Sequence, residues 1–248
     1  MEYNIPENLF YTNYLVTDTP ADINDDQYVY YDKTIPRFPD EAIYIYSVAQ
    51  KKMIYTKGWE EVLGYKDCEI TLKKVLFTTT EEYARFSNDL NENAIKFIMN
   101  HPEDLEQYSF VIELKKIRKD GSIVPLICRV GVLKAEHGKP SLLIGRFQIN
   151  KNIRLGKIMY YAAYGPQKYQ FEEYLNKKLF NYFAITYKEK EALEMVTQGL
   201  SFKEIAHQLN VSQSAIEKRI LPLYKKFNVK SLPHLISFAY ENLILTQK

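Results

Sequence analysis

Hydrophobic and polar residues alternate with a period of two in several stretches between residues 42 and 150. The stretches "AIYIYSV" at 42–48 and "KMIYT" at 52–56 flank a turn-like "AQK", which predicts a β-hairpin. Three more strands are predicted downstream, with a turn at Asp120-Gly121 between the first two and "SLLIGRFQI" as the third, after the loop "EHGKP". One face of the first strand carries Phe110, Ile112 and Leu114. One face of the second carries Val124, Leu126, Cys128, Val130 and Val132.

Apolar residues recur at steps of three and four in other segments. The stretch "GWEEVLGY" predicts a short helix that Gly64 ends in a left-handed conformation. A longer amphipathic helix is predicted between about Glu81 and Met99, and another after Gly165-Pro166. Their repeating apolar residues are Tyr83, Phe86, Leu90, Phe97 and Ile98, and Phe171, Tyr174, Leu175, Leu179 and Tyr182. Residues 1–40 show no sustained period, which predicts a loosely structured arm that packs its tyrosines on the neighbouring domain.

Capping residues mark two helix starts in the C-terminal region. Thr186 with Glu189, and Ser201 with Glu204, have the spacing of a capping box. Gly199 is suited to end the first of these helices, because glycine adopts the left-handed conformation without strain. Two short helices are therefore predicted before residue 210.

A third helix is predicted after a tight turn at Asn210, with Ser212 as its N-cap. Its apolar stripe consists of Ile216, Ile220, Leu223 and Phe227. The opposite side carries Ser214, Glu217, Lys218, Leu221 and Lys225. A hairpin that only buries apolar surface would show a mixture of acids and bases there. Glu217 is the only acid and is followed by Lys218, Arg219, Lys225 and Lys226, which favours a nucleic acid as the partner.

Composition places the chain among globular proteins. Its 248 residues are 46% hydrophobic and 26% charged, with a net charge of +2. Residues 1–40 hold eight acidic and two basic residues, so the rest of the chain is basic, a weak indication of a polyanionic partner. No N-terminal signal or membrane-length apolar run is present, so we expect a cytoplasmic protein without membrane contact. Cys68 and Cys128 lack the spacing of a metal site, and no metal is expected.

Residues 42–150 resemble the PAS family of sensory domains. "WEEVLGY" at 59–65 is similar to the family's short helix that ends in Gly-Tyr, and "IELKKIRKDGSIVPLICRV" at 112–130 is similar to its long hairpin. The resemblance implies a five-stranded antiparallel sheet with helices. Such a domain would sense a small-molecule or protein signal, or mediate dimerisation. The ligand-binding residues are unknown from the sequence.

Cofactors of PAS domains need residues that this segment does not supply. A photochemical flavin site needs an Asn-Cys-Arg type of loop, and "KDCEI" around Cys68 does not match it. His101 precedes "PEDL", which predicts a loop and a solvent-facing imidazole and not a haem ligand. No cofactor is therefore predicted.

Residues 185–245 resemble the LuxR type of helix-turn-helix domain. The shared features are Thr186 and Glu191, the run "GLSFKEIA" at 199–206, "VS" at 211–212 and "KFNV" at 226–229. The resemblance implies a four-helix domain that inserts its third helix into the major groove of double-stranded DNA. It also implies a homodimer formed partly through the fourth helix, Leu232 to Asn242. The dimer surface would be the apolar stripe of this helix, which consists of Leu235, Ile236, Ala239 and Leu243.

The resemblance and the exposed face of the third helix together indicate the residues that contact DNA. The predicted base contacts are Ser214, Glu217, Lys218 and Leu221. The predicted phosphate contacts are Lys203, Ser212, Arg219, Lys225 and Lys226. Arg219 replaces a usual histidine, and Pro222 replaces a usual polar residue. Proline removes a helical hydrogen bond, so the third helix is predicted to bend or restart near Leu221.

The predicted fold is α+β, with an all-α C-terminal domain. Four segments are expected: an acidic arm at 1–41, a PAS-like sensory domain at 42–150, a helical linker at 151–184 and a LuxR-type domain at 185–248. The predicted function is sequence-specific regulation of transcription, without enzymatic activity. Two alternatives are a cofactor-binding redox protein or enzyme whose helical C-terminus is only a dimerisation module, and a protein-protein adaptor.

Overall fold

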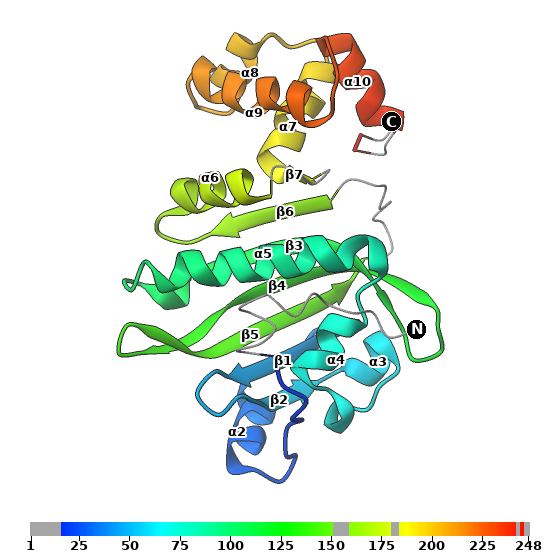
Figure 1. Cartoon of the computed structure of the whole chain (residues 1–248), viewed down its shortest axis with the longest axis vertical. Helices are drawn as coiled ribbons and strands as arrows, with labels where there is room; N and C mark the ends of the chain where they lie inside the picture. The colour runs from blue at the N-terminus through cyan, green and yellow to red at the C-terminus, as the bar shows by residue number, and fades with distance from the viewer. Residues whose placement is uncertain (1–15, 151–158, 180–183, 242–243, 246–248) are drawn as a thin grey trace. The chain divides into compact units, whose positions relative to one another are not determined.

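The strands predicted between residues 42 and 150 are all present in the computed structural model, which describes residues 16–150, 159–179, 184–241 and 244–245 (Figure 1). They are Glu41–Ser47 (β1), Lys52–Lys57 (β2), Ser109–Ile117 (β3), Ile123–Glu136 (β4) and Lys139–Ile149 (β5). Neighbouring strands in the order β2-β1-β5-β4-β3 are antiparallel, as predicted. The last two strands extend further than expected, because a turn at His137 and Gly138 replaces the predicted five-residue loop.

The described residues divide into two compact units. Residues 16–150 and 163–179 belong to the first, and residues 159–162 together with those from 184 onward belong to the second. The predicted linker, 151–184, is therefore shared between the units. Residues 151–158 and 180–183, including Tyr182 of the predicted linker helix, lie outside the described residues.

Two strands that the sequence pattern does not predict lie in this shared region. They are Met159–Tyr164 (β6) and Ala184–Thr186 (β7), which pair in parallel with Tyr160 opposite Ile185. A helical pattern alone is therefore the wrong prediction for this segment. The stretch "MYYAAY" has no alternation of polar and apolar residues, because four consecutive residues of β6 are buried.

Helices of the first unit follow the predictions closely, with two additions. They are Asp26–Thr34 (α2), Trp59–Leu63 (α3), Leu72–Phe77 (α4), Glu81–Met99 (α5) and Lys168–Lys178 (α6). Gly64 ends α3 at φ 76°, in the left-handed conformation that the sequence predicts for it. Helices α2 and α4 are the additions. No helix among the described residues has the length and apolar character needed to span a membrane.

Helix α2 shows that the prediction of a loosely structured arm is wrong for residues 26–34. Asp25 caps the helix, and its carboxylate accepts a hydrogen bond of 2.8 Å from the Gln27 backbone. The Tyr28 hydroxyl donates to the Thr56 carbonyl at 2.7 Å, and its ring lies 5.2 Å from that of Tyr55. The expected packing of tyrosines is thus confirmed for Tyr28. Only this one residue of α2 is buried, so the helix has no apolar stripe for a sequence pattern to reveal.

One face of the sheet packs against α4 and α5. Side chains from these two helices line a cavity together with side chains from β1, β3, β4 and β5. The inward face predicted for β3 and β4 is confirmed, because its residues are buried or half-buried. The Trp59 indole donates to the Ile43 carbonyl at 2.9 Å, which satisfies its N–H in this core.

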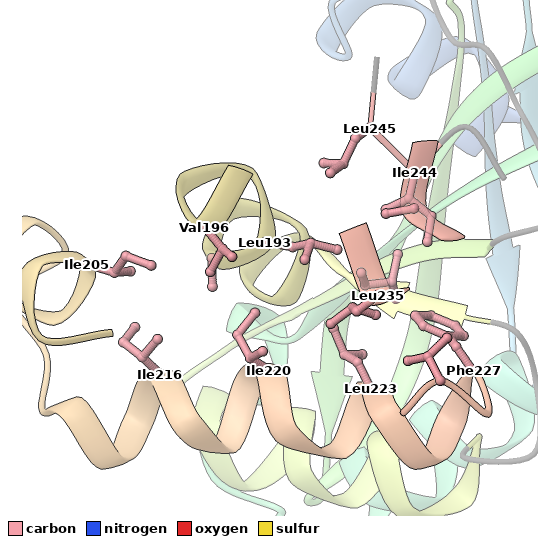
Figure 2. Close-up of a cluster of buried hydrophobic side chains, with 14 of the residues drawn as sticks. Leu193, Val196, Ile205, Ile216, Ile220, Leu223, Phe227, Leu235, Ile244 and Leu245 are labelled. Carbon is pink, nitrogen blue, oxygen red and sulfur yellow. The ribbon is translucent and has the colours of Figure 1, made fainter. Parts of the chain in front are cut away.

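The second unit contains the predicted four-helix domain. Its helices are Tyr187–Thr197 (α7), Phe202–Gln208 (α8), Gln213–Lys226 (α9) and Leu232–Glu241 (α10). They enclose a core of their own, to which α7, α8, α9 and α10 all contribute buried apolar residues (Figure 2). Asn242, the expected end of the fourth helix, lies outside the described residues.

Candidate nucleic-acid interface

Both predicted capping boxes are formed. The Thr186 hydroxyl accepts a hydrogen bond of 3.2 Å from the Glu189 backbone, while the Glu189 carboxylate accepts one of 2.7 Å from the Thr186 backbone. Ser201 and Glu204 repeat this exchange at the start of α8, at 3.3 and 2.8 Å. The Ser201 hydroxyl and backbone also lower the pKa of Glu204. Each pair satisfies backbone N–H groups that a helix start leaves without partners.

A tight turn brings α8 and α9 together. Asn210 adopts φ 52°, as expected for this residue in a left-handed turn. The Ser212 side chain then accepts a hydrogen bond of 3.2 Å from the Ala215 backbone, which confirms it as the N-cap of α9. Because the connection between α8 and α9 is short, the turn itself fixes how the two helices lie relative to each other.

The apolar stripe of α9 is buried as predicted. Figure 2 shows Ile216, Ile220, Leu223 and Phe227 pointing from α9 into the core of the domain. Facing them are Leu193 and Val196 of α7, Ile205 of α8 and Leu235 of α10. Burial of this stripe fixes the orientation of α9 about its own axis. It therefore also determines which residues of the helix point outward.

The predicted base-contacting residues lie on the outward side of α9. Steps of three, one and three residues separate Ser214, Glu217, Lys218 and Leu221, so these four share one helical face. Lys225, a predicted phosphate contact, lies four residues further along the same face. Leu221 is 49% exposed although it is apolar, which a role in its own domain core does not explain. The Gln213 amide donates to the Glu217 carboxylate at 2.9 Å, so Gln213 borders the same face. Sequence reasoning overlooked Gln213, whose spacing of four from Glu217 was the available signal.

The predicted phosphate-contacting residues fall into two groups. Lys203, Ser212 and Lys225 are exposed, the first two at the starts of α8 and α9. Backbone N–H groups and the positive end of the helix dipole at such starts favour an anion. These three side chains are therefore accessible to an anionic partner, and their contacts with phosphate stay predictions.

Arg219 and Lys226 do not join that surface. The Arg219 side chain is only 16% exposed, and its guanidinium lies 3.6 Å from the Glu191 carboxylate of α7. Lys226 is partly buried, and desolvation lowers its pKa while the nearby Glu189 carboxylate opposes that effect. Their contacts with phosphate stay predictions. The ion pair with Glu191 joins Arg219 of α9 to α7.

Pro222 does not divide α9 in two. The helix is one element from Gln213 to Lys226, so the predicted restart near Leu221 is wrong. Pro222 is exposed. Water can therefore reach the Lys218 carbonyl that loses its helical partner, which reduces the cost of the proline.

The predicted apolar stripe of α10 faces its own domain. Leu235 and Ala239 are fully buried in the core that α7 and α9 share, and Ile236 packs against that core. Leu243 lies outside the described residues. The prediction that these residues form a dimer surface is therefore wrong for Leu235 and Ala239. The exposed residues of α10 are Pro233, His234, Ser237 and Glu241.

Comparison with known proteins shows which proteins the second unit resembles. Residues 184–239 match the family described as "Bacterial regulatory proteins, luxR family". The transcriptional regulatory protein YdfI of Bacillus subtilis is 34% identical over 80 residues, which cover 32% of this chain and 37% of YdfI. The CsgBAC operon transcriptional regulatory protein of Escherichia coli is 36% identical over 59 residues, covering 24% and 27%. The chain spans about a third of the length of the curated relatives that it matches.

Solved structures with a similar chain include one matched over most of this chain and one matched over less than half of it. VqmA of Vibrio cholerae, solved as a dimer, is 14% identical to this chain, with a TM-score of 0.36. The alignment covers 89% of this chain and 89% of the VqmA chain. The PAS domain of a protein from Colwellia psychrerythraea is 17% identical, covers 46% of this chain and 88% of that chain, and also has a TM-score of 0.36.

Proposed function

We propose that this protein regulates transcription by binding specific DNA sequences, because residues 184–239 match the luxR family of bacterial regulatory proteins. Helix α9 enters the major groove, and its outward face contacts base edges. The first unit, with its PAS-like sheet, receives the signal. The protein acts in the cytoplasm as a homodimer, and it needs no redox cofactor or catalytic activity for this role.

One observation carries the proposal. The exposed face of α9 combines a cation, an acid, a hydroxyl and an apolar side chain, while the opposite face is fully used by the domain core. Lysine donates to guanine, a carboxylate accepts from cytosine, and an apolar group contacts the thymine methyl. Such a mixed set suits the reading of bases better than a uniformly basic surface, which would only attract phosphates.

Selection from random DNA tests the proposal directly. The full-length protein is mixed with random duplexes, bound fragments are amplified over several rounds, and the enriched sequences are compared. We expect one motif to emerge, and binding to it should be at least about a thousandfold tighter than to scrambled duplexes. Enrichment without a shared motif would contradict sequence-specific recognition. A failure to bind any duplex, even at low salt, would contradict DNA binding altogether.

A further inference from the structure

Glu217 is the only acidic residue on the outward face of α9, and no basic side chain neutralises it. Among the residues that the structure describes, no lysine or arginine forms an ion pair with its carboxylate. The acids of α7 and α8, by contrast, each pair with a basic residue or complete a capping box: Glu189, Glu191, Glu194 and Glu204. A carboxylate that stays charged on a surface proposed to meet phosphates opposes binding, unless it contacts a donor there.

Helical spacing explains why Glu217 has no cation beside it. The residues three and four positions away on either side are all uncharged: Gln213, Ser214, Ile220 and Leu221. Lys218 is adjacent in sequence, but successive residues of a helix point in directions about 100° apart and do not face each other. The sequence of α9 therefore keeps the negative charge of Glu217.

Gln213, the first residue of α9, is the hydrogen-bond partner of this carboxylate. Its amide nitrogen donates to Oε1 of Glu217 at 2.9 Å. Side chains on a helix point back toward its N-terminus, which directs Glu217 toward Gln213. Glu217 is half-buried, while Ser214, Lys218 and Leu221 around it are exposed. The hydrogen bond thus limits the orientations of the carboxylate without removing its charge.

The second carboxylate oxygen of Glu217, Oε2, can still accept hydrogen bonds. No donor among the described residues reaches it. Cytosine is the one base that presents a donor and no acceptor in the major groove. Guanine and thymine present acceptors, which repel a carboxylate, and adenine has its N7 acceptor beside its amino group. A carboxylate held in one orientation therefore favours cytosine.

We propose that Gln213 is a positioning residue for DNA recognition: its amide holds the Glu217 carboxylate so that Oε2 accepts a hydrogen bond from the amino group of a cytosine in the bound site. This inference rests on the proposed function, because it needs α9 in the major groove. The selection experiment described above tests that function. The variants below test the pair, so the two proposals can fail separately.

The hydrogen bond is tested first in the full-length protein without DNA. In NMR spectra of isotope-labelled protein, the side-chain amide signals of Gln213 are assigned by their loss in Gln213→Ala. They should shift when Glu217 is replaced by alanine. Gln208 is the matched control, because it is an exposed glutamine at the end of α8, and its signals should not shift. Gln213 signals that stay unchanged in Glu217→Ala would overturn the pair.

A double-mutant cycle then tests the positioning role on DNA. The measured quantity is discrimination, the ratio of affinities for the selected duplex and for one with the contacted cytosine changed to thymine. We expect discrimination to fall about tenfold in Glu217→Ala and about threefold or more in Gln213→Ala. The double variant should lose no more than Glu217→Ala, because the amide then has no carboxylate to hold. An equal further loss from Gln213→Ala in both backgrounds would show that Gln213 acts independently, contrary to the proposal.

Two further readouts separate positioning from a general loss of binding. Gln213→Ala should reduce discrimination at the same base pair as Glu217→Ala, without changing the slope of log affinity against log salt, because glutamine is uncharged. Alanine favours a helix more than glutamine does, so fraying of α9 does not explain a loss. Gln208→Ala should change neither quantity. A base other than cytosine at that pair, or a loss spread evenly over all base pairs, contradicts the assignment.

Discussion

Neighbouring charges on α9 are predicted to have different tasks. Lys218 lies in the middle of the outward face, between Glu217 and Leu221, where the proposed binding mode expects contact with base edges. Lys225 lies two turns further along, near the end of the helix, where the proposed binding mode expects contact with the DNA backbone. Removing each one therefore tests a different kind of contact.

We predict that Lys218→Ala costs about 1 to 3 kcal/mol at the selected DNA site and reduces discrimination at one base pair. Lys225→Ala should weaken binding to all duplexes alike and reduce the slope of log affinity against log salt by about one unit. The measurement is the affinity of each variant for selected and scrambled duplexes at several salt concentrations. If both variants lose the same energy on both duplexes with the same slope, α9 does not read bases.

Lys116 makes a separate prediction about pH. Its pKa is about 8 in the folded state, below that of an exposed lysine, so the unfolded chain binds more protons between about pH 8 and 10. The cost of burying its charge is thus fully present below pH 8 and disappears as the pH rises toward 10. Stability should increase over this interval by up to roughly 3 kcal/mol from this residue.

Comparison with Lys116→Met isolates that contribution, because other groups titrate equally in both proteins. The chain has a single tryptophan, Trp59, which is buried in the first unit and reports its unfolding by fluorescence. Urea unfolding curves at pH 7, 8, 9 and 10 supply the measurement. A constant difference in stability between the two proteins would contradict the lowered pKa of Lys116.

At the scale of elements, α9 is a continuous helix although it contains a proline, Pro222. Pro222 lies on the exposed side of a continuous helix, so it costs one hydrogen bond without changing the packed side. The buried stripe continues past it through Leu223 and Phe227. The helix is therefore held by the core on both sides of the proline.

We predict that Pro222→Ala stabilises the second unit by about 1 to 2 kcal/mol, because it restores the hydrogen bond to the Lys218 carbonyl. The gain is reduced because the unfolded chain of the variant has more conformational freedom. Calorimetric melting of the full-length variant measures this change. DNA affinity and its salt slope should not change. A smaller slope in the variant would show instead that the proline directs Lys225 toward the phosphates.

Aromatic packing joins two helices of the first unit that are far apart in sequence. The rings of Phe97 on α5 and Phe171 on α6 are stacked 4.5 Å apart at 10°, and Tyr108 meets Phe171 edge-on at 6.0 Å. Gly165 leaves the space that the Tyr108 ring occupies, since a Cβ there would lie 2.3 Å from the ring. Helix α6 thus belongs to the packing of the first unit, although the sequence pattern assigned it to a linker.

At the scale of the whole molecule, the second unit has its own core and capped helices. We predict that residues 180–248 fold alone and bind DNA weakly. The fragment lacks Tyr160, which is buried in that core, so it should melt at a lower temperature than a fragment that begins at residue 154. Circular dichroism on both fragments tests this, and an unfolded spectrum for residues 180–248 would contradict the proposed independence.

Assembly on DNA is a second prediction at this scale. Helix-turn-helix proteins commonly bind as symmetric dimers to two half-sites, so we expect two copies on a site with about one helical turn between half-site centres. The contact cannot use Leu235 and Ala239, which are buried within one copy. Light scattering on the protein with its selected duplex measures the stoichiometry. One copy per duplex would contradict the homodimer.

The sequence by itself determined the features that depend on neighbouring residues. Capping boxes at Thr186 and Ser201 form between residues three apart, and the stripe of α9 follows from helical spacing within one segment. The hairpin of β3 and β4 follows from alternation on both sides of a short turn. The residues that interact in these features are only a few positions apart, so a local sequence pattern is sufficient to predict them.

Only the tertiary structure decided which surfaces meet. An apolar stripe shows that a helix face is buried, but it does not show against what, so α10 was assigned to a partner molecule while Leu235 packs in its own core. Helix α2 is held by contacts with β2, and Arg219 is paired with Glu191, both across long separations in sequence. The inward lysine of β3 completes a cavity with residues from α4 and α5. These arrangements depend on partners far along the chain, and for that reason no local pattern reveals them.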